Sequence, residues 1–564
     1  MEKRAILAAI LMAGVLLLYQ VLFIKSPEHP APTPDRREVP QGTAVREQPK
    51  AAPPGPAAAV PRVEVATVPE RTAIIDGPLY RAVVDSRGGR LDDWTLHYRG
   101  EKSMVVSREI GPPGLTVSRS GSPAEVVPFA ISPDTLKLGP DNPKGQVRLI
   151  GEDGYGLRIT QDMTFAQDSY LVESRILVEN RNNVPQRADI ELIWRAPVQW
   201  GKDAVQKFQG QHPVRTVRFV GTSVQREDLH KIPGYTGPGH WVGLESEWYL
   251  TAIIPDANKF QIIEAKRSEA AAGGGAPSEF AEIGVKAALP DLAPGQSWEG
   301  RVSTYMGPKE FERLKSLGVG LEKSIYFGGF PIPQAYGGLP MEWLAVPILW
   351  VMHLFYAYIG NYGVAIILLT VITKVLFFPL TIKSMTSMRA MQSLQPQINA
   401  LRSKFKSDPQ RLQQETMALY RTHKVNPLGG CLPMVVQIPI FYALYVALSV
   451  SVELQNQPFI CFGHIFGVDL WICDLASHDP TYVLPLLMGA SMFIQQKMTP
   501  VMGDPRQARM MLFMPVVFTF MFLNLPAGLV LYWTLSNVFQ IAQQKYMERI
   551  GNAEKGLARS PKKA

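Results

Sequence analysis

The sequence predicts a polytopic α-helical membrane protein with six transmembrane helices and a large extracytoplasmic antiparallel β-sandwich domain. Three observations predict this fold class. Long runs of Leu, Val, Ile, Phe and Met dominate residues 343–544, whereas residues 76–333 are polar and rich in turns. In the polar half, hydrophobic residues alternate with polar ones, which is typical of half-buried strands. Lys and Arg residues gather at the ends of the apolar runs, as they do in membrane proteins.

The composition describes two different parts of one chain. The 564 residues are 46% hydrophobic on average and carry a formal net charge of +8. Because the excess lysines and arginines flank apolar segments or lie in the last twenty residues, we expect no DNA partner. The three cysteines are Cys431, Cys461 and Cys473, and their spacing does not indicate a metal site. A disulfide between Cys461 and Cys473 is left open.

The N-terminal part predicts an anchor and a linker. Residues 1–25 hold an apolar run of about twenty residues, long enough to cross the membrane, after Lys3 and Arg4. A cleaved signal peptide is the alternative, but its apolar region would be shorter and would precede a small-residue cleavage site. Residues 26–70 are rich in proline and alanine and predict a semi-extended linker.

Residues 71–335 predict the β-sandwich domain. SYLVESRILVEN, from residue 169, and RADIELIWRAPV, from residue 187, alternate with a period of two, and SRGGR (86–90) predicts a turn. The domain contains no catalytic motif. Trp241, Trp248 and Tyr249 could line a sugar or peptide groove, but core packing is the favoured interpretation.

The apolar half predicts one surface helix and five further spans. Residues 341–360 form an amphipathic segment interrupted by Pro347, which we expect on the outer membrane surface. The core, 361–546, is followed by a basic tail, 547–564. The predicted spans are 361–383, 428–452, 481–500, 509–523 and 526–544.

Charge placement predicts the topology. The segment between the second and third spans is strongly basic, whereas the loop 453–478 has no Lys or Arg, so the first lies inside and the second outside. The link 501–509 and the tail are also basic. Both termini are therefore predicted to be cytoplasmic, and the β domain, between the first two spans, extracytoplasmic.

Lys374 is the most informative residue of the core because it interrupts an apolar span. A central lysine costs about 2.5–3.5 kcal/mol, so such a group usually faces a partner or a wet cavity. Snorkelling is the alternative, but the polar end at Lys383 lies nine residues on, about 13 Å along a helix. A buried polar cavity is the favoured interpretation.

Residues 384–426 predict a basic helical hairpin. Apolar residues recur at intervals of three and four from Met388 to Phe405, and Asp408 with Pro409 predicts the N-cap and first turn of a second helix. Two interpretations stay open with equal weight. One is a solvated cytoplasmic loop, and the other is a moving lid that meets nascent chain or anionic lipid.

Two further groups of residues lie at membrane depth. The polar group needs hydrogen-bond partners in hydrocarbon, and it encloses a wet hollow if its members face Lys374. It consists of Thr370, Gln437, Ser536, Asn537 and Gln540. The methionine group, flexible enough to accept varied apolar partners, includes Met510, Met514 and Met521 in the fifth span. Simple gap-filling by these methionines is the alternative.

No sequence motif predicts covalent chemistry. A Walker A loop, an HExxH pair, a GxSxG elbow and a GxGxxG turn are all absent, so we predict neither an enzyme nor a cofactor. A channel or secondary transporter whose substrate ion pairs with Lys374 is the alternative function. It would require inverted repeats or an acidic ligand within a span, and the sequence shows neither.

Four segments resemble the YidC/Oxa family of membrane protein insertases, in its Gram-negative form with a large periplasmic domain. They are TKVLFFPLT (373–381), KVNPLGGCLPMVVQIPIFYALY (424–445), LPLLMGASMFIQQKMTP (484–500) and FMPVVFTFMFLNLPAGLVLYWTLSN (513–537). The resemblance is dense over residues 341–545. Residues 1–335 resemble the family in layout more than in motif.

The resemblance implies a five-helix insertase core with a hydrophilic groove that opens to the cytoplasm and to lipid. Such a protein takes a nascent polypeptide into the groove and releases its apolar segment sideways into the inner membrane, alone or with the Sec translocon. The implied groove residues are Lys374, Thr370, Gln437, Trp533, Tyr532, Ser536 and Asn537, and the implied hydrophobic slide is Met510, Met514, Phe518 and Met521. Trp471 corresponds to the family's periplasmic-loop tryptophan.

The resemblance also implies the partners of the protein. At two positions, however, the sequence departs from the pattern of the family. The partners are nascent membrane proteins, the Sec translocon, phospholipids, and the ribosome with the signal recognition machinery at the hairpin and tail. The family's groove cation is most often arginine, whereas Lys374 keeps the charge without the fixed fork of donors. Trp533 stands where some relatives carry tyrosine, so a role that depends on a hydroxyl is not carried over.

Overall fold

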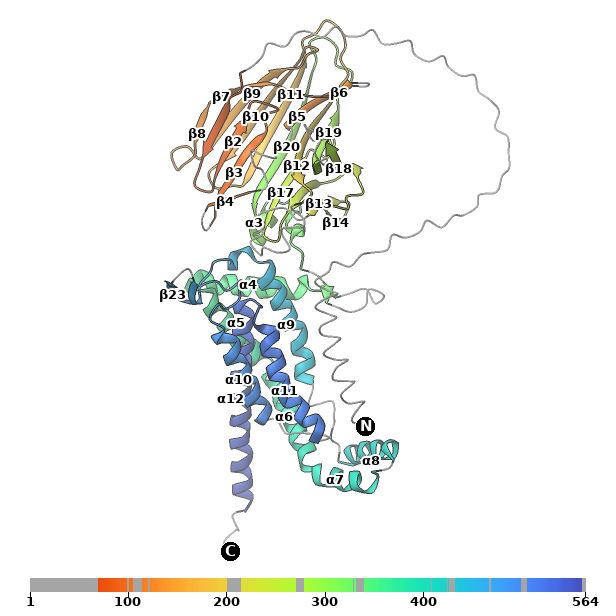
Figure 1. Ribbon diagram of the computed structural model, residues 1–564, viewed down its shortest axis with the longest axis vertical. Coiled ribbons are helices and arrows are strands. Elements are labelled where there is room, and N and C mark those ends of the chain that lie inside the picture. The colour runs from red at the N-terminus through yellow and green to blue at the C-terminus, as the bar shows by residue number, and fades with distance from the viewer. Residues whose placement is uncertain are drawn as a thin grey trace, which may run out of the picture. The chain divides into compact units, whose positions relative to one another are not determined.

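Figure 1 shows the computed structural model of the chain. It describes residues 69–98, 101–104, 114–119, 122–199, 215–269, 278–327, 329–330, 339–406, 408–423, 425, 432–465, 468–498 and 505–559. The predicted anchor, almost all of the predicted linker, Cys431 and the end of the predicted tail lie outside these residues.

The largest sheet of the β domain has nine strands in the order β14-β13-β16-β17-β20-β11-β10-β9-β7, all paired antiparallel. Its strands are β7 (Phe129–Ser132), β9 (Lys144–Glu152), β10 (Leu157–Ala166), β11 (Leu171–Asn180), β13 (Arg215–Val220), β14 (Ser223–Asp228), β16 (Trp241–Glu245), β17 (Tyr249–Pro255) and β20 (Ser297–Pro308).

Two smaller sheets complete the β domain in the described residues. The six-stranded sheet has the order β15-β18-β19-β12-β5-β6, with β5 (Gly114–Arg119), β6 (Ser122–Val126), β12 (Asp189–Pro197), β15 (Tyr235–Gly237), β18 (Gln261–Glu269) and β19 (Ser278–Ala288). The five-stranded sheet has the order β4-β3-β2-β1-β8, with β1 (Thr72–Asp76), β2 (Tyr80–Asp85), β3 (Leu91–His97), β4 (Glu101–Ser103) and β8 (Thr135–Lys137).

The alternating pattern explains why these segments form strands. On β11, Val172, Ile176 and Val178 are buried, whereas Glu173, Arg175, Leu177 and Glu179, on the other face of the strand, are at least partly exposed. The same alternation buries Ile190 and Trp194 on β12. Both predicted strands are confirmed. The sandwich arrangement of the sheets stays a prediction.

The predicted turn at 86–90 is confirmed by its glycines. Gly88 and Gly89 both have positive φ angles, 71° and 58°, where side chains with a Cβ are strained. A Cβ on Gly89 would also lie 2.7 Å from Gln161 Oε1. The turn connects β2 to β3, which pair antiparallel.

The aromatic residues Trp241, Trp248 and Tyr249 are buried, and Trp248 also donates from Nε1 to the Ser449 carbonyl on α9 (Leu432–Val450) over 3.1 Å. Their exposed fractions are 0%, 8% and 1%. The favoured interpretation, core packing, is therefore confirmed, and these side chains leave no surface for a sugar or peptide.

The helical core contains nine described α-helices after the short helices α3 (Phe311–Ser316) and η1 (Leu321–Ser324). They are α4 (Glu342–Ile359), α5 (Tyr362–Leu376), α6 (Phe378–Ser393), α7 (Gln395–Lys404), α8 (Pro409–Thr422), α9 (Leu432–Val450), α10 (Val483–Met498), α11 (Pro505–Phe522) and α12 (Ala527–Arg559). Short connections are η4 (Val452–Leu454) and the pairs β21 (Gly329–Phe330) with β22 (Leu339–Pro340) and β23 (Ile460–Ile465) with β24 (Val468–Ile472).

Within the bundle, α10 packs against α11 and α12, and α5 packs against α4 and α12. Figure 1 shows α4 lying across one end of the bundle and α12 extending beyond the other end. Asn361 caps α5, because its side chain accepts a hydrogen bond from the Val364 backbone N–H over 3.1 Å.

The predicted span 361–383 is not one straight helix. It breaks between α5 and α6, whose axes differ by 59°. Pro379 lies in the first turn of α6, where its missing N–H costs nothing, whereas inside a continuous helix it would remove a hydrogen bond. The helix therefore ends at Leu376 and restarts after Phe377.

The predicted hairpin 384–426 contains three helical segments rather than two. Its first helix breaks at Leu394, before Pro396 in the first turn of α7. The second helix begins as predicted, because Asp408 accepts a hydrogen bond from the Arg411 N–H over 3.1 Å and Pro409 lies in the first turn. The N-cap prediction is confirmed.

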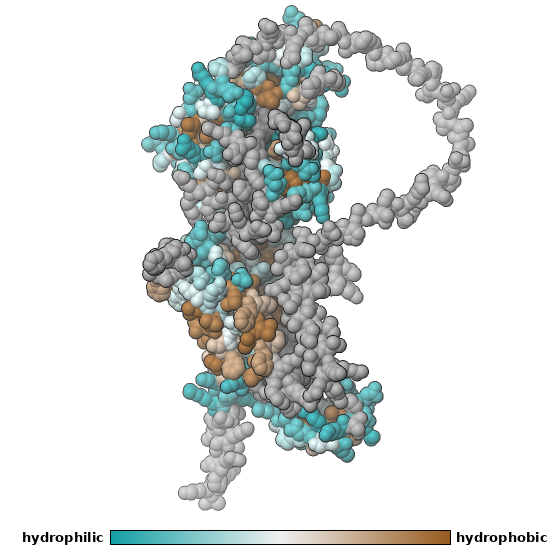
Figure 2. Space-filling model, in the orientation of Figure 1, coloured by the Kyte–Doolittle hydropathy of each residue, from teal (hydrophilic) through white to brown (hydrophobic). Residues whose placement is uncertain are grey.

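Length and composition alone identify few membrane spans among the described helices. Only α4 is long and apolar enough by itself, and the bent pair α5–α6 adds a second candidate. The surface location of α4 and the count of six spans therefore stay predictions. On the face shown in Figure 2, hydrophobic side chains gather over the bundle and hydrophilic ones over the sheets and the α7–α8 hairpin.

Candidate functional site

Lys374 lies in the last turn of α5 and is half-buried. Its neighbours Ile366 and Leu369 on α5 are buried apolar residues. In the part of the chain that the structure describes, no carboxylate forms an ion pair with the Lys374 ammonium group. Because a buried cation without a counter-ion is costly, Lys374 is the candidate centre of the site.

A strip of hydroxyl groups from α5 and α12 includes Thr373, the residue directly before Lys374. Thr370, fully buried, donates from Oγ1 to the Ile366 carbonyl over 2.7 Å, and Thr373 donates to the Thr370 carbonyl over 2.8 Å. The Tyr532 hydroxyl on α12 lies against Thr373 and Ser536. The structure thus brings together four hydroxyl residues on two helices, three of which the sequence had singled out.

Asn537 faces a different helix. Its Nδ2 donates to Ser491 Oγ on α10 over 3.0 Å, and Ser491 in turn donates to the Met488 carbonyl over 2.7 Å. Asn537 and Ser491 are both buried. The predicted groove residue therefore links α12 to α10, and it is tied to that helix rather than directed at Lys374.

Gln437 lies half-buried on α9, two residues before the internal Pro439. Among the hydrogen bonds of the described residues, none joins Gln437 to Lys374. Its place in the groove stays a prediction.

The indole of Trp533 lies in a cluster of aromatic rings from three helices. Its ring centroid is 4.5 Å from Phe441 on α9, 5.3 Å from Phe522 and 6.3 Å from Phe518 on α11. Phe441 and Phe522 are themselves 6.2 Å apart. These rings connect α9 and α11 to α12 and form an apolar surface next to the hydroxyl strip, since Trp533 directly follows Tyr532.

Three of the four predicted slide residues have described side chains on α11. Phe518 belongs to the aromatic cluster, Met521 packs against the core, and Met514 is half-buried. The side chain of Met510 lies outside the described part of the chain. The slide itself stays a prediction.

Four residues of the site were not singled out from the sequence, and one of them is Thr373 on α5. Ser491, Phe441 and Phe522 acquire their place only through partners on other helices. The spacing of four between Phe518 and Phe522 was an available signal for a shared face on α11. No local signal distinguishes Ser491 from an ordinary helix serine.

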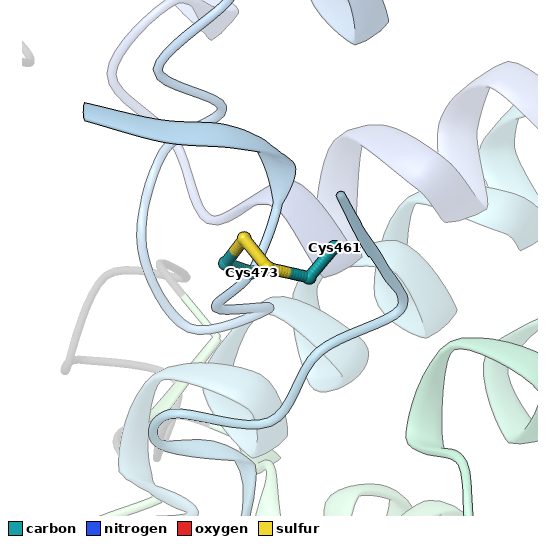
Figure 3. The surroundings of a disulfide bond; sticks show 2 residues. All are labelled: Cys461 and Cys473. Carbon is teal, nitrogen blue, oxygen red and sulfur yellow. A yellow bond between two sulfur atoms is a disulfide. The ribbon is translucent and has the colours of Figure 1, made fainter. Parts of the chain in front are cut away.

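Cys461 on β23 and Cys473, the residue directly after β24, form a disulfide, which settles the alternative left open above (Figure 3). Next to the disulfide, Trp471 stacks on Phe462 with ring centroids 6.0 Å apart. Trp471 therefore has its partner within the hairpin β23–β24.

The described residues contain no group of three or more His, Cys, Asp or Glu side chains that could hold a metal ion. The arrangement at Lys374 instead offers one cation, several hydroxyl donors and an aromatic surface. Such a set of groups can attract an acidic or polar segment and accept an apolar one beside it.

Comparisons with known proteins identify the family. Residues 73–351 match the model of the YidC periplasmic domain, and residues 354–555 match the model of the 60Kd inner membrane protein. The membrane protein insertase YidC of Syntrophus aciditrophicus is 36% identical over 573 residues, covering 97% of this chain and 100% of that protein. The membrane protein insertase YidC of Pelobacter propionicus is 37% identical over 579 residues, covering 98% and 100%.

A solved structure also aligns with the chain. The crystal structure of an active YidC insertase with its first transmembrane domain resolved covers 86% of this chain and 95% of its own, at 19% identity. The TM-score is 0.36, so the assignment depends on the sequence relatives. The chain belongs to the YidC family of membrane protein insertases, with the family's periplasmic β-rich domain and its helical inner-membrane core.

Proposed function

We propose that this protein inserts hydrophobic nascent polypeptides into the inner membrane through a hydrophilic groove around Lys374. The observation that carries the proposal is a half-buried lysine on α5 that has no ion pair in the described structure and directly follows Thr373, a member of the hydroxyl strip. A cation in this setting is available to a passing segment, because no resident carboxylate competes for it.

The first step is recognition of the polar part of the substrate. A short segment that precedes or connects apolar helices often carries Asp or Glu, and the Lys374 ammonium attracts these charges into the membrane. The hydroxyl group of the half-buried Thr373 replaces part of the water that the segment loses. Together they lower the cost of carrying polar groups partway across, which is about 2.5–3.5 kcal/mol for a single charge at the centre of the membrane.

The second step is release of the apolar part. The slide, formed by Met514, Phe518 and Met521 on α11, and the rings of Phe441 and Trp533 give an apolar segment a surface on which to rest. Flexible methionines fit many side-chain shapes. Sideways movement into lipid then buries about twenty apolar residues, which makes release favourable.

The partners follow from this route. Nascent membrane proteins are the substrates, received alone or from the Sec translocon. The α7–α8 hairpin and the C-terminal tail present their basic residues to the ribosome, the signal recognition machinery and anionic phospholipids. Both termini are cytoplasmic in this arrangement. Asp408 and Glu415 are the only acidic residues of the hairpin between Lys383 and Lys424.

The test is insertion of a single-span substrate with an acidic translocated segment into vesicles that contain the purified full chain. Lys374→Arg should keep activity, because the positive charge remains. Lys374→Ala and Lys374→Glu should lower the rate roughly fivefold or more, since 1 kcal/mol of lost attraction corresponds to about a factor of five. The matched control is Lys383→Glu, which changes an exposed lysine on α6.

The substrate itself supplies a second control. A version whose translocated segment is neutral should be inserted equally by the wild type and by Lys374→Ala. Equal rates for all three Lys374 variants on the acidic substrate would refute a role for the charge. A Lys374-dependent ion current through the same vesicles, without insertion, would instead favour the channel.

A further inference from the structure

The outer side of α10 and α11 contains a hollow of about 520 Å³. It differs from the slide, because the residues of α11 that line it occupy other positions on that helix. The residues that line it are Tyr482, Leu486, Gly489, Ala490, Phe493, Pro515, Val516, Thr519, Phe520 and Leu523. Met514, Phe518 and Met521 do not line the hollow, so the hollow and the slide lie on separate faces of α11.

Small residues and a close helix contact form the hollow. A Cβ on Gly489 would lie 2.1 Å from Thr519 Oγ1, so α10 and α11 approach closely only because this residue is glycine. Ala490, next to it, leaves space that a larger side chain would fill. The larger side chains Phe493 and Phe520 contribute to the walls.

The wall of the hollow is apolar throughout its length. Apart from Tyr482, Thr519 is the one lining residue with a hydroxyl group. That hydroxyl donates to the Pro515 carbonyl over 2.7 Å. Leu486, Val516 and Phe520 on its rim are 61%, 51% and 70% exposed. Exposed apolar side chains of this size on a membrane-spanning helix face hydrocarbon rather than water.

The length of the hollow matches one leaflet. From Tyr482 to Phe493 there are eleven residues, which span about 16 Å along α10. Half of the hydrocarbon core of a bilayer is about 15 Å. Tyr482 lies just before α10, its ring is 6.3 Å from that of His478, and tyrosine is enriched at the level of the headgroups.

We propose that this hollow binds an acyl chain of one phospholipid from the periplasmic leaflet, with its headgroup near Tyr482 and His478. The leaflet assignment depends on the proposed topology, in which the loop before α10 is periplasmic. α11 thus has two roles on opposite faces, since the slide contacts the substrate and the hollow holds a lipid. A bound lipid fills the space beside Gly489 and stabilises the contact between α10 and α11.

The test measures lipid at the site directly. The full chain is reconstituted in vesicles of phosphatidylethanolamine and phosphatidylglycerol that contain phosphatidylethanolamine with a diazirine on its acyl chain. After irradiation, mass spectrometry should find the label on residues that line the hollow, severalfold above the label at Leu487 and Val517, two exposed residues that do not line it. The lining residues to be compared are Leu486, Ala490, Phe493, Val516, Phe520 and Leu523. Uniform labelling of all exposed positions would overturn the proposal.

Filling the hollow supplies a second measurement. Ala490→Trp places a large ring in the space, whereas Leu487→Trp adds the same ring to the exposed surface of the same helix. Ala490→Trp should reduce the label in the hollow severalfold, and Leu487→Trp should leave it unchanged. Equal labelling of the two variants would contradict an acyl-chain site at Ala490.

A third measurement separates lipid from substrate. A benzophenone amino acid at position 490 should crosslink to lipid and not to a stalled nascent membrane protein, whereas the same group at position 514 should crosslink to the nascent chain. Nascent-chain crosslinks at 490 as strong as those at 514 would assign the hollow to the substrate route and overturn the lipid site. Insertion is assayed in the same vesicles, so that failure of the proposed function, with lipid labelling intact, is recognised as a separate result.

Discussion

Asn537 on α12 donates a hydrogen bond from Nδ2 to Ser491 Oγ on α10 over 3.0 Å, and both side chains are buried. The two residues are 46 positions apart in the chain. A hydrogen bond of this kind holds two membrane helices in register, because neither group finds water in hydrocarbon. It therefore stabilises the packing of α12 against α10.

This bond predicts energetic coupling between the two residues. In a double-mutant cycle of Ser491→Ala and Asn537→Ala, we expect a coupling of about 0.6 kcal/mol, and at most about 1.7 kcal/mol. Thermal unfolding of the full chain in detergent supplies the free energies. The control is Thr534→Ala, which removes a hydroxyl that bonds only to Val530 of its own helix. Additive effects of the two substitutions would contradict the bond.

The aromatic cluster predicts how Trp533 tolerates replacement. Trp533→Ala removes the ring contacts with Phe441, Phe518 and Phe522 and should destabilise the bundle by about 3 kcal/mol, with a loss of insertion. Trp533→Tyr keeps a large ring and should retain most of the activity. The readouts are the melting temperature and the insertion rate.

The matched control for Trp533 is Phe513→Ala on α11, since the Phe513 ring is 69% exposed. It should change the melting temperature little. If Trp533→Ala were as stable as Phe513→Ala and yet inactive, the indole would act on the substrate directly rather than by holding the three helices together.

Lys309 in the β domain predicts a pH dependence of stability. Its side chain is 5% exposed, and its Nζ donates to Glu245 Oε2 over 2.9 Å and to the Ser246 carbonyl over 2.8 Å. Burial lowers the pKa of Lys309 below its usual 10.5, although the charge of Glu245 opposes that shift. The folded state thus binds fewer protons than the unfolded state between the lowered pKa and 10.5.

Because of this difference, the free energy of unfolding should rise with pH across that window. The penalty from Lys309 is largest below its folded pKa and disappears as the unfolded lysine also loses its proton near 10.5. Denaturant unfolding of the full chain, followed by tryptophan fluorescence, measures the slope. Lys309→Met has no proton to lose, so the difference between wild type and this variant isolates the contribution of Lys309. An identical slope in both proteins would contradict the prediction.

The disulfide predicts a pattern of thiol labelling. The chain has three cysteines, and the bond between Cys461 and Cys473 leaves Cys431 as the sole thiol. In the denatured chain, a mass-tagged maleimide should add one tag without reductant and three after reduction. Loss of the disulfide should lower the free energy of unfolding of the hairpin β23–β24 by about 3 kcal/mol, the value for a closed loop of similar length. Proteolysis of the loop 455–478 before and after reduction measures that change, and three tags without reductant would contradict the bond.

The sequence predicted most of the local structure because the causes are local. The alternation on β11 and β12 depends on residues two apart, the turn at 86–90 on two glycines, and the start of α8 on Asp408 with Pro409. Prolines also explain where the sequence-based prediction was too simple. The apolar pattern continues through both breaks and therefore predicted continuous helices. In the structure a new helix begins at each break, with Pro379 in the first turn of α6 and Pro396 in the first turn of α7.

Only part of the candidate site could be predicted from the sequence. Lys374 and its neighbour Thr370 could be found from the chain alone, because a charge inside an apolar run is costly wherever the run folds. The partners of the other polar groups could not be found in this way. Asn537 bonds to Ser491 and Tyr532 lies against Thr373, and each pair joins helices that are distant in the chain.

By itself, then, the sequence determined the strands, the apolar helices and the position of one cation within an apolar helix. These depend on periodicity and hydrophobicity, which each short segment expresses alone. Only the tertiary structure decided the disulfide partner, the aromatic cluster at Trp533 and the hollow beside Gly489. Each of these depends on how two helices or strands approach one another, and that distance results from packing of the whole bundle or sheet rather than from any one segment.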